Sequence, residues 1–403
     1  MNIFVVSWYG ESEFWFASIK IIAIIGLIIL GVVLFFGGGP NHDRLGFRYW
    51  QHPGAFKEYA ASGSTGRFLA FWTALVRSGF AFILSPELVI LCAGETEAPR
   101  RNIPKAAGRF IYRLSVFYIL GSLVISIIVA SNDPQLLQAV SSGKTNAGAS
   151  PFVLGIQRAG IKGLNHVINA VILTSAWSAG NSFLFAGSRS LYSLAITGQA
   201  PSIFRTCNKR GVPWVAVLFS ASLACLVYLS VSAGSAAVFN WFLNLTTISG
   251  FIAWICIMMT YLVSSSPPPT LETYWPSLTP YPQRFRKALA YHSVLEQRPY
   301  KTVFQPYMTY FTLIFLVVLT LTNGFQIFFP GKFSAANFLA AYITLPIFIV
   351  LYLGHKIWYR TPLVYKVSQI DVFTLKEVAD RLEEEDVKPV PRNLLERIWF
   401  WIA

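Results

Sequence analysis

The sequence predicts an all-α polytopic membrane protein, and three observations support this. Hydrophobic residues make up 54% of the 403-residue chain and charged residues only 12%, whereas soluble domains carry about 25% charge. Apolar runs of about 20 residues recur along the chain, long enough to cross a hydrocarbon core as helices. Basic residues gather in the connections between these runs, as in the cytoplasmic loops of membrane proteins.

We expect eight membrane-spanning helices from these apolar runs. The first run ends sharply at Gly37–Pro40, since glycine and proline terminate helices. The third and fifth runs are near the short end of the spanning range. The expected spans are residues 14–36, 68–92, 110–130, 164–194, 213–232, 236–262, 303–329 and 335–357.

The distribution of charge predicts an orientation. If the chain starts in the cytoplasm, the inner connections hold more Lys and Arg than the outer ones, so both termini are expected to be cytoplasmic. The net charge of +14 is explained by these connections, and no soluble domain carries the basic stripe expected of a nucleic-acid partner. The four cysteines have no metal-ligand or disulfide spacing, so we expect no cofactor and no metal.

One lysine lies inside the first apolar run. This run, Phe14–Phe36, reads FWFASIKIIAIIGLIILGVVLFF and contains Lys20. A charge at the centre of a spanning helix costs about 2.5 to 3.5 kcal/mol by insertion scales. Either the Lys20 stem snorkels to the interface, or the amine faces the inside of a helix bundle and takes part in ion or substrate movement. The run alone leaves both open.

The second apolar run is interrupted by proline beside an acid. The segment FAFILSPELVILC contains Pro86, which removes a backbone donor, followed by Glu87. Broken helices at membrane depth are tolerated where they line a cavity, and transporters use their ends to hold substrates and ions. The alternative is a simple kink with Glu87 as a cap or a snorkelling residue.

Two later spans carry small polar residues and amides. The fourth span includes Ser178 and Asn181, and the sixth includes Asn244. Small polar residues commonly hold membrane helices together, so most of them are expected to be packing residues and only a few to face a site.

The segment Val263–Gln283 fits neither a helix nor an ordinary short loop. It reads VSSSPPPTLETYWPSLTPYPQ, and proline at this density favours extended coil. It is either a flexible loop or a retained intron, since Val and Gln codons can supply in-frame splice borders. Enzyme signatures such as GxxxxGK[ST], HExxH and GxSxG are absent from the sequence, so we expect no enzyme.

Several stretches together resemble fungal amino acid permeases, of the amino acid–polyamine–organocation superfamily. They include YGESEFWFASIKIIAIIG, GGGPNHDRLGFRYWQHPGAF, ETEAPRRNIPKAAGRFIYR, GNSFLFAGSRSLYSLA, CNKRGVPWVAV and VFNWFLNLTTISGFIAW. The resemblance implies a partial LeuT-like fold with eight of an expected twelve helices, starting at helix 5, so that helices 1 to 4 of the family are not represented. It also implies proton-coupled amino acid uptake, with an amino acid and protons as partners in the lipid bilayer, at the plasma membrane.

The resemblance assigns the parts of the chain and its site residues. The proton-coupling residues would be Lys20 in helix 5 and Glu87 in broken helix 6. The substrate would contact Phe82, Ile83, Leu84, Ser85, Ser178, Asn181 and Asn244. The expected parts are helix 5 (1–36), an extracellular loop (37–67), the second repeat with helices 6–10 (68–262), the insert (263–283), a cytoplasmic loop (284–302), helices 11–12 (303–357) and a cytoplasmic tail (358–403).

The break departs from the family pattern. The family reads near FSFAGSE, whereas FAFILSPE is one residue longer and has proline, which points to a subgroup with its own specificity. The sequence also allows a second class of function. In this alternative the chain is a non-transporting, truncated membrane protein or pseudogene product that associates with a full-length permease.

Overall fold

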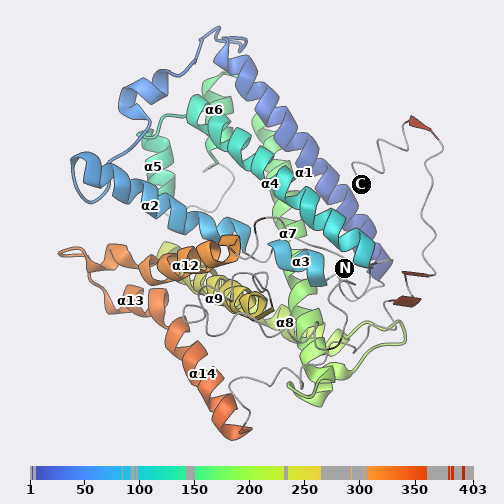
Figure 1. Ribbon diagram of the computed structural model, residues 1–403. Coiled ribbons are helices and arrows are strands. Elements are labelled where there is room, and N and C mark those ends of the chain that lie inside the picture. The colour runs from blue at the N-terminus through green and yellow to red at the C-terminus, as the bar shows by residue number, and fades with distance from the viewer. Residues whose placement is uncertain are drawn as a thin grey trace.

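The computed structural model describes residues 2, 6–83, 85–91, 96, 99–141, 150–230, 235–264, 292, 304, 307–360, 380–381, 383–384 and 393–394. The regular elements in these residues are helices, which confirms the all-α class (Figure 1). Most of the predicted insert and most of the predicted tail lie outside the described residues, so those two predictions are not addressed by the fold.

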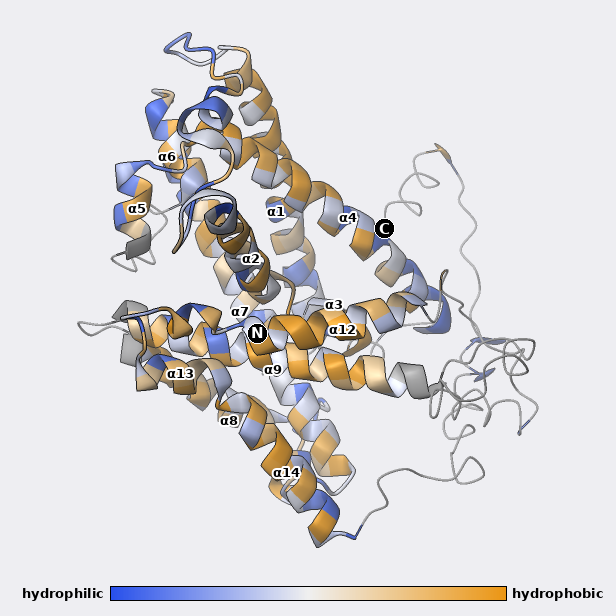
Figure 2. Ribbon diagram, turned by 60° about the vertical axis from the view of Figure 1, so that its left-hand side comes forward, coloured by the Kyte–Doolittle hydropathy of each residue, from blue (hydrophilic) through white to orange (hydrophobic). Residues whose placement is uncertain are grey.

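The long apolar runs form the expected helices. The four longest are α1 (Val6–Phe35), α4 (Pro99–Ile128), α7 (Leu164–Ile196) and α9 (Ser235–Ser264). Apolar residues make up much of their length (Figure 2), and large side chains such as Ile22 and Leu173 are about 70% exposed. An apolar exterior of this kind fits a lipid surrounding rather than water.

Several predicted spans are built from more than one helix. The second comprises α2 (Gly63–Phe82) and α3 (Ser85–Leu91), and the fifth comprises α8 (Trp214–Leu223) and the 3₁₀ turn η5 (Ala224–Ser230). The last two comprise α12 (Tyr307–Thr322) with η7 (Phe325–Phe328), and α13 (Ala335–Tyr342) with α14 (Thr344–Trp358).

Five helices in the described residues are long and apolar enough to cross a membrane, or six if α13 and α14, bent by 46°, form one span. The two remaining expected spans hold shorter apolar helices, Trp214–Tyr228 and Tyr307–Thr322. The total of eight spans therefore stays a prediction.

The third span begins earlier than predicted. Helix α4 starts at Pro99 rather than at residue 110, so basic residues assigned to a connection lie on its first turns. The segment Lys105–Arg109 is rich in good helix formers, and a search for apolar runs detects only the membrane part of such a helix.

Two short helices occupy the connection between α4 and α7, which was expected to be a loop. They are α5 (Pro134–Ser141) and α6 (Pro151–Arg158). Helix α5 is capped by the fully buried Asp133, whose carboxylate accepts the backbone N–H groups of Gln135 and Leu136 at 2.8 and 3.0 Å. Arg158 at the end of α6 forms an ion pair with the same carboxylate, so the two helices are joined by one buried acid.

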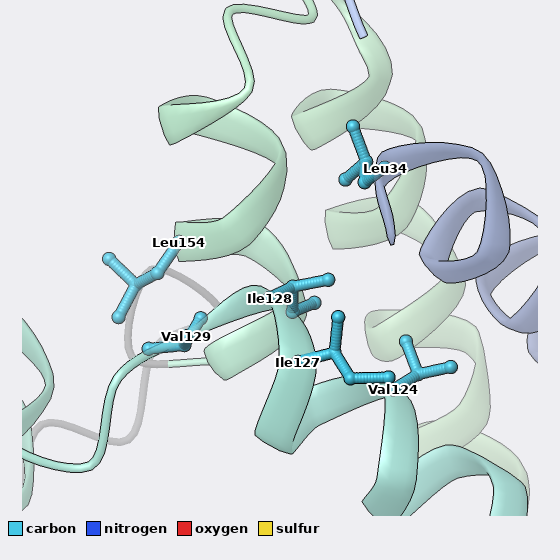
Figure 3. Close-up of a cluster of buried hydrophobic side chains, with 6 residues drawn as sticks. All are labelled: Leu34, Val124, Ile127, Ile128, Val129 and Leu154. Atoms are coloured by element: carbon cyan, nitrogen blue, oxygen red, sulfur yellow. The ribbon is translucent and has the colours of Figure 1, made fainter. Parts of the chain in front are cut away.

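A first helix group surrounds α1. Helix α1 packs against α4 and α7, and α6 packs against both of these. Its core gathers at the ends of α1 and α4 (Figure 3), where a Cβ on Gly31 would collide with the Val124 side chain. The close approach of α1 and α4 therefore depends on this glycine. The core residues are Leu34, Val124, Ile127, Ile128, Val129 and Leu154.

A second helix group surrounds α9, which packs against α2, α12, α13 and α14. Its core contains Val76, Ile248, Phe251, Ile252, Leu316 and Leu319. The broken span joins the two groups, because α2 packs against α9 whereas α3 packs against α4 and α7. The break predicted from the sequence thus lies at the boundary between the groups.

Candidate functional site

The predicted break in the second span is confirmed. Helix α2 ends at Phe82, Ile83 has extended backbone (φ −64°, ψ 141°), and α3 begins at Ser85. Pro86 is the second residue of α3, a position where a helix has no use for the missing N–H. Proline here starts a new helix rather than kinking an existing one. The carbonyls at the end of α2 are therefore available to other partners.

One face of the broken span packs closely against α9. A Cβ on Gly79 would collide with the Phe251 ring, and one on Gly250 would lie 2.6 Å from the Ile83 side chain. Ile83 is only 5% exposed. Its side chain therefore fills the space above Gly250, and only its backbone remains a candidate substrate contact.

The side chain of Glu87, on α3, contacts the second helix group. Its carboxylate accepts the indole N–H of Trp254 on α9. The other carboxylate oxygen of Glu87 is buried without a hydrogen-bond partner in the described structure. This second oxygen is therefore the part of Glu87 that is not used in holding α3 against α9.

The Phe82 side chain, at the end of α2, contacts α4 rather than α9. Phe82 lies against Tyr118 of α4, with ring centroids 4.9 Å apart, and the Tyr118 hydroxyl donates to the Ala81 carbonyl at 3.2 Å. Ser85 is half-buried at the start of α3, and Leu84 lies outside the described residues. The predicted contacts at the break are thus split between α4 and α9.

Lys20 faces α7 and belongs to a polar network. Its ammonium donates to the Ser178 hydroxyl at 2.7 Å. That hydroxyl donates in turn to one oxygen of Glu13 at 2.5 Å, and the Asn181 amide donates to the other at 3.1 Å. Ser178 is fully buried. The structure therefore brings Lys20 together with Ser178 and Asn181, and it adds Glu13.

The network continues toward the start of α1. The Tyr9 hydroxyl donates to Ser182 at 3.3 Å, and the Tyr9 ring stacks on Phe185 at 4.4 Å. The Arg189 guanidinium lies 4.6 Å over the Phe185 ring. Asn2, 4% exposed, donates to the Asn181 backbone and side-chain oxygens at 3.0 and 2.9 Å. We call Glu13, Lys20, Ser178 and Asn181 the α1–α7 network.

Asn244 is not part of this network. It lines a cavity of about 450 Å³ in the second helix group, between α2, α9 and the α12–α13 region. Sequence reasoning did not single out this cavity, and Arg77 of the spanning helix α2 also lines it. Its polar lining residues are Tyr59, Thr73, Arg77, Asn240, Asn244, Thr247, Asn323, Gln326, Lys332 and Asn337.

Glu13 was also missed by sequence reasoning, although one signal was present. It lies one residue before the apolar run that begins at Phe14, so it was left outside the span. It is seven residues from Lys20, which is close to two helical turns and places both on one face. An acid and a base at that spacing in a membrane helix predict a shared partner.

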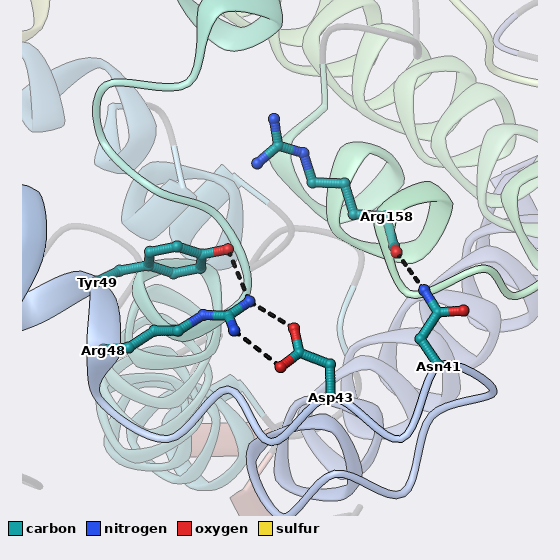
Figure 4. Close-up of polar contacts among 5 residues, drawn as sticks. All are labelled: Asn41, Asp43, Arg48, Tyr49 and Arg158. Atoms are coloured by element: carbon teal, nitrogen blue, oxygen red, sulfur yellow. Dashed lines mark hydrogen bonds and ion pairs between the residues drawn. The ribbon is translucent and has the colours of Figure 1, made fainter.

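The connection after α1 is fixed by polar contacts (Figure 4). Arg48 donates two hydrogen bonds to Asp43, at 2.8 and 2.7 Å, and one to the Tyr49 hydroxyl at 3.2 Å. The hydrogen bond with Asp43 raises the pKa of Arg48 above its ordinary value. Asn41 donates to the Arg158 carbonyl at 2.9 Å, which ties this connection to α6. These contacts position the loop.

In the described residues, no group of three His, Cys, Asp or Glu side chains is placed to hold a metal ion. The site offers an amine, two carboxylates and the backbone carbonyls at the end of α2, of which the Ala81 carbonyl already accepts from Tyr118. Such groups can move protons and hold a zwitterion.

The sequence matches a known family along most of its length. A sequence model described as amino acid permease matches residues 1–266 and 270–366. The chain is 59% identical over 402 residues to a proline-specific permease of Emericella nidulans, covering 100% of this chain and 69% of that protein.

Two yeasts provide similar relatives. A probable proline-specific permease of Schizosaccharomyces pombe is 59% identical over 404 residues, covering 100% of this chain and 69% of the relative. A proline-specific permease of Saccharomyces cerevisiae is 52% identical over 394 residues, or 97% of this chain and 60% of that protein. The chain thus spans roughly two thirds of the length of these relatives.

Proposed function

Because this chain belongs to the amino acid permease family, whose members are membrane transporters, we propose that it carries proline across the membrane together with protons. The assignment of proline as the substrate rests on 59% identity over the whole chain to a protein named a proline-specific permease. The proton coupling is supported by Lys20, hydrogen-bonded inside the α1–α7 network. We place the protein at the plasma membrane with both termini in the cytoplasm, on the charge distribution of its connections.

The substrate site in this proposal lies at the break. The carbonyls at the end of α2 form the negative end of that helix, and they suit the secondary ammonium of proline. Phe82 and Ser85 border this position, with the backbone of Ile83. Leu84, which lies outside the described residues, stays a proposed contact on the sequence resemblance alone. In the complete site, Ser178 and Asn181 of α7 and Asn244 of α9 approach from the two helix groups.

The two coupling groups in this proposal are Lys20 and Glu87. Each lies in a spanning helix and contacts a neighbouring helix, α7 for Lys20 and α9 for Glu87. A change in protonation at either position alters a helix–helix contact. Proton binding can therefore bias the packing of the two groups around the substrate.

Uptake of radiolabelled proline tests the proposal. The protein is expressed in yeast cells that lack proline uptake of their own, and uptake is followed from pH 4.5 to 7.5 with a protonophore as control. We expect proline uptake that falls as pH rises, that is abolished by the protonophore, and that excess lysine or glutamate does not inhibit.

Two further results would contradict parts of this proposal. If the protein reaches the cell surface without taking up proline, the proposed substrate is wrong. If Lys20→Ala leaves the pH dependence of uptake unchanged, Lys20 has no coupling role.

A further inference from the structure

We propose that Glu13 is a coupling residue that shares one proton with Lys20 through the Ser178 hydroxyl. This inference rests on the proposed proton-coupled transport and identifies the partner that receives the proton from Lys20. The sequence did not indicate a functional role for Glu13. The proposal rests on the hydrogen bonds that its carboxylate accepts within the α1–α7 network.

The hydrogen bonds define a relay with one direction. A serine hydroxyl has a single proton, and Ser178 donates it to Glu13 at 2.5 Å. Its oxygen lone pairs are then free to accept, and they accept from Lys20 at 2.7 Å. Lys20 therefore contacts Glu13 through one fully buried hydroxyl.

Proton transfer along this relay follows the order of the donors and moves no heavy atoms. The Lys20 ammonium gives a proton to the Ser178 oxygen while the Ser178 proton passes to the Glu13 carboxylate. The products are a neutral amine, a neutral carboxylic acid and a serine hydroxyl that now donates to the amine. Neither Lys20 nor Glu13 carries a charge after this step. The loss of two buried charges removes their desolvation penalty, which offsets part of the free-energy cost of the proton transfer.

The position of Glu13 gives the relay an orientation in the membrane. Glu13 is seven residues closer to the start of α1 than Lys20, about 10 Å along the helix axis. Helix α1 starts on the cytoplasmic side in the proposed orientation. A proton leaving Lys20 through Ser178 therefore moves toward the cytoplasm, the direction that uptake requires.

The charged surroundings of the pair come from three helices. Helix α7 contributes Arg189, over the Phe185 ring on which Tyr9 stacks, and also Tyr192. Helix α4, which packs along α1, carries Arg109 and Arg113 in its first half.

Helix α3 packs against α7 and carries Glu87, whose carboxylate is bonded to Trp254 of α9. The direct polar contacts described for Lys20 are with Ser178, and those of Glu13 are with Ser178 and Asn181.

The variant Glu13→Gln tests the proposal because it keeps the shape and removes the proton site. Without the carboxylate, a higher proton concentration is needed to hold the proton on Lys20. We expect half-maximal proline uptake to move to lower pH by about one unit, a tenfold change in proton concentration. The matched control is Glu11→Gln, an exposed acid two residues away, for which we expect the wild-type pH profile.

Substrate exchange separates coupling from folding and binding. Exchange of labelled for unlabelled proline at equal pH across the membrane needs no net proton movement. We expect Glu13→Gln to retain exchange while the pH profile of its net uptake is altered. The Glu13→Gln, Ser178→Ala double variant is expected to shift this pH profile no further than Glu13→Gln alone.

Three outcomes would overturn the inference. They are an unchanged pH profile for Glu13→Gln, a loss of exchange together with net uptake, or additive effects in the double variant. If Lys20→Ala also keeps the wild-type pH dependence, the proposed coupling through Lys20 fails as well, whereas a Lys20 effect without a Glu13 effect overturns this inference alone.

Discussion

The α1–α7 network and the cavity beside α9 both place polar side chains among apolar helices, but they satisfy them differently. In the network, each donor meets an acceptor on the opposite helix within 3.1 Å. In the cavity, Asn244 and Arg77 border about 450 Å³ of space. A closed network fixes the distance between two helices, whereas an open polar cavity can admit water or a ligand.

The largest effect on transport is expected at the contact between the two helix groups, where Glu87 meets Trp254. Glu87→Gln keeps an oxygen that can accept from Trp254 but removes the proton site. We expect proline uptake to fall at least about tenfold, equivalent to about 1.4 kcal/mol on the transport barrier. Uptake and surface abundance are measured together, with Trp254→Phe as the variant that removes the donor instead. Wild-type uptake by Glu87→Gln would leave Glu87 with only a structural part in the break.

Two asparagines, Asn181 in the α1–α7 network and Asn244 in the cavity beside α9, test whether the two sites differ in stability. Asn181 donates to the Glu13 carboxylate, so Asn181→Ala leaves a charged acceptor unsatisfied and is expected to cost about 1.5 to 3 kcal/mol of stability. Asn244→Ala only enlarges an open cavity, and we expect a change within about 0.5 kcal/mol. Unfolding in detergent, followed by the loss of a fluorescence-detected monodisperse peak on heating, measures both. Equal losses would show that the cavity is as closed as the network.

Two glycines, Gly250 in α9 and Gly26 in α1, extend the comparison from polar contacts to packing, and Gly26 has the smaller expected effect. A Cβ on Gly250 would lie 2.6 Å from Ile83, so Gly250→Ala is expected to destabilise the protein by about 1 to 3 kcal/mol through overpacking. Gly26 in α1 has open space around its Cβ position, so Gly26→Ala is expected to be neutral or stabilising by about 0.5 to 1 kcal/mol. The same heating assay separates them. Recovery of stability in the Gly250→Ala, Ile83→Ala double variant would identify the Ile83 contact as the cause.

Much of the fold could be predicted from the sequence, because apolar runs and helix breakers are local signals. The break near Pro86 followed from such signals. The direction that Lys20 faces did not, because the apolar run alone left snorkelling and the bundle interior open. The split of the last span at Ile343 and the short helices α5 and α6 did not, since they depend on packing against other elements rather than on a long run.

The candidate site was harder to predict than the fold. Its polar residues were recognised one span at a time, whereas the structure divides them between two helix groups. Lys20, Ser178 and Asn181 lie together because α1 and α7 pack side by side, and Asn244 lies apart because α9 belongs to the other group. Glu13 fell outside the apolar run although its spacing from Lys20 placed it on the same face.

The extended backbone at Ile83 has a mechanical consequence. Helix α2 is 20 residues long, or about 30 Å, and it is anchored at the break to a short helix of the other group. A rotation of about 10° at Ile83 would displace the far end of such a 30 Å arm by about 5 Å, roughly one helical turn. Because the backbone is extended at Ile83, a small rotation beside Glu87 would therefore be amplified to a displacement of about one helical turn at the opposite end of α2.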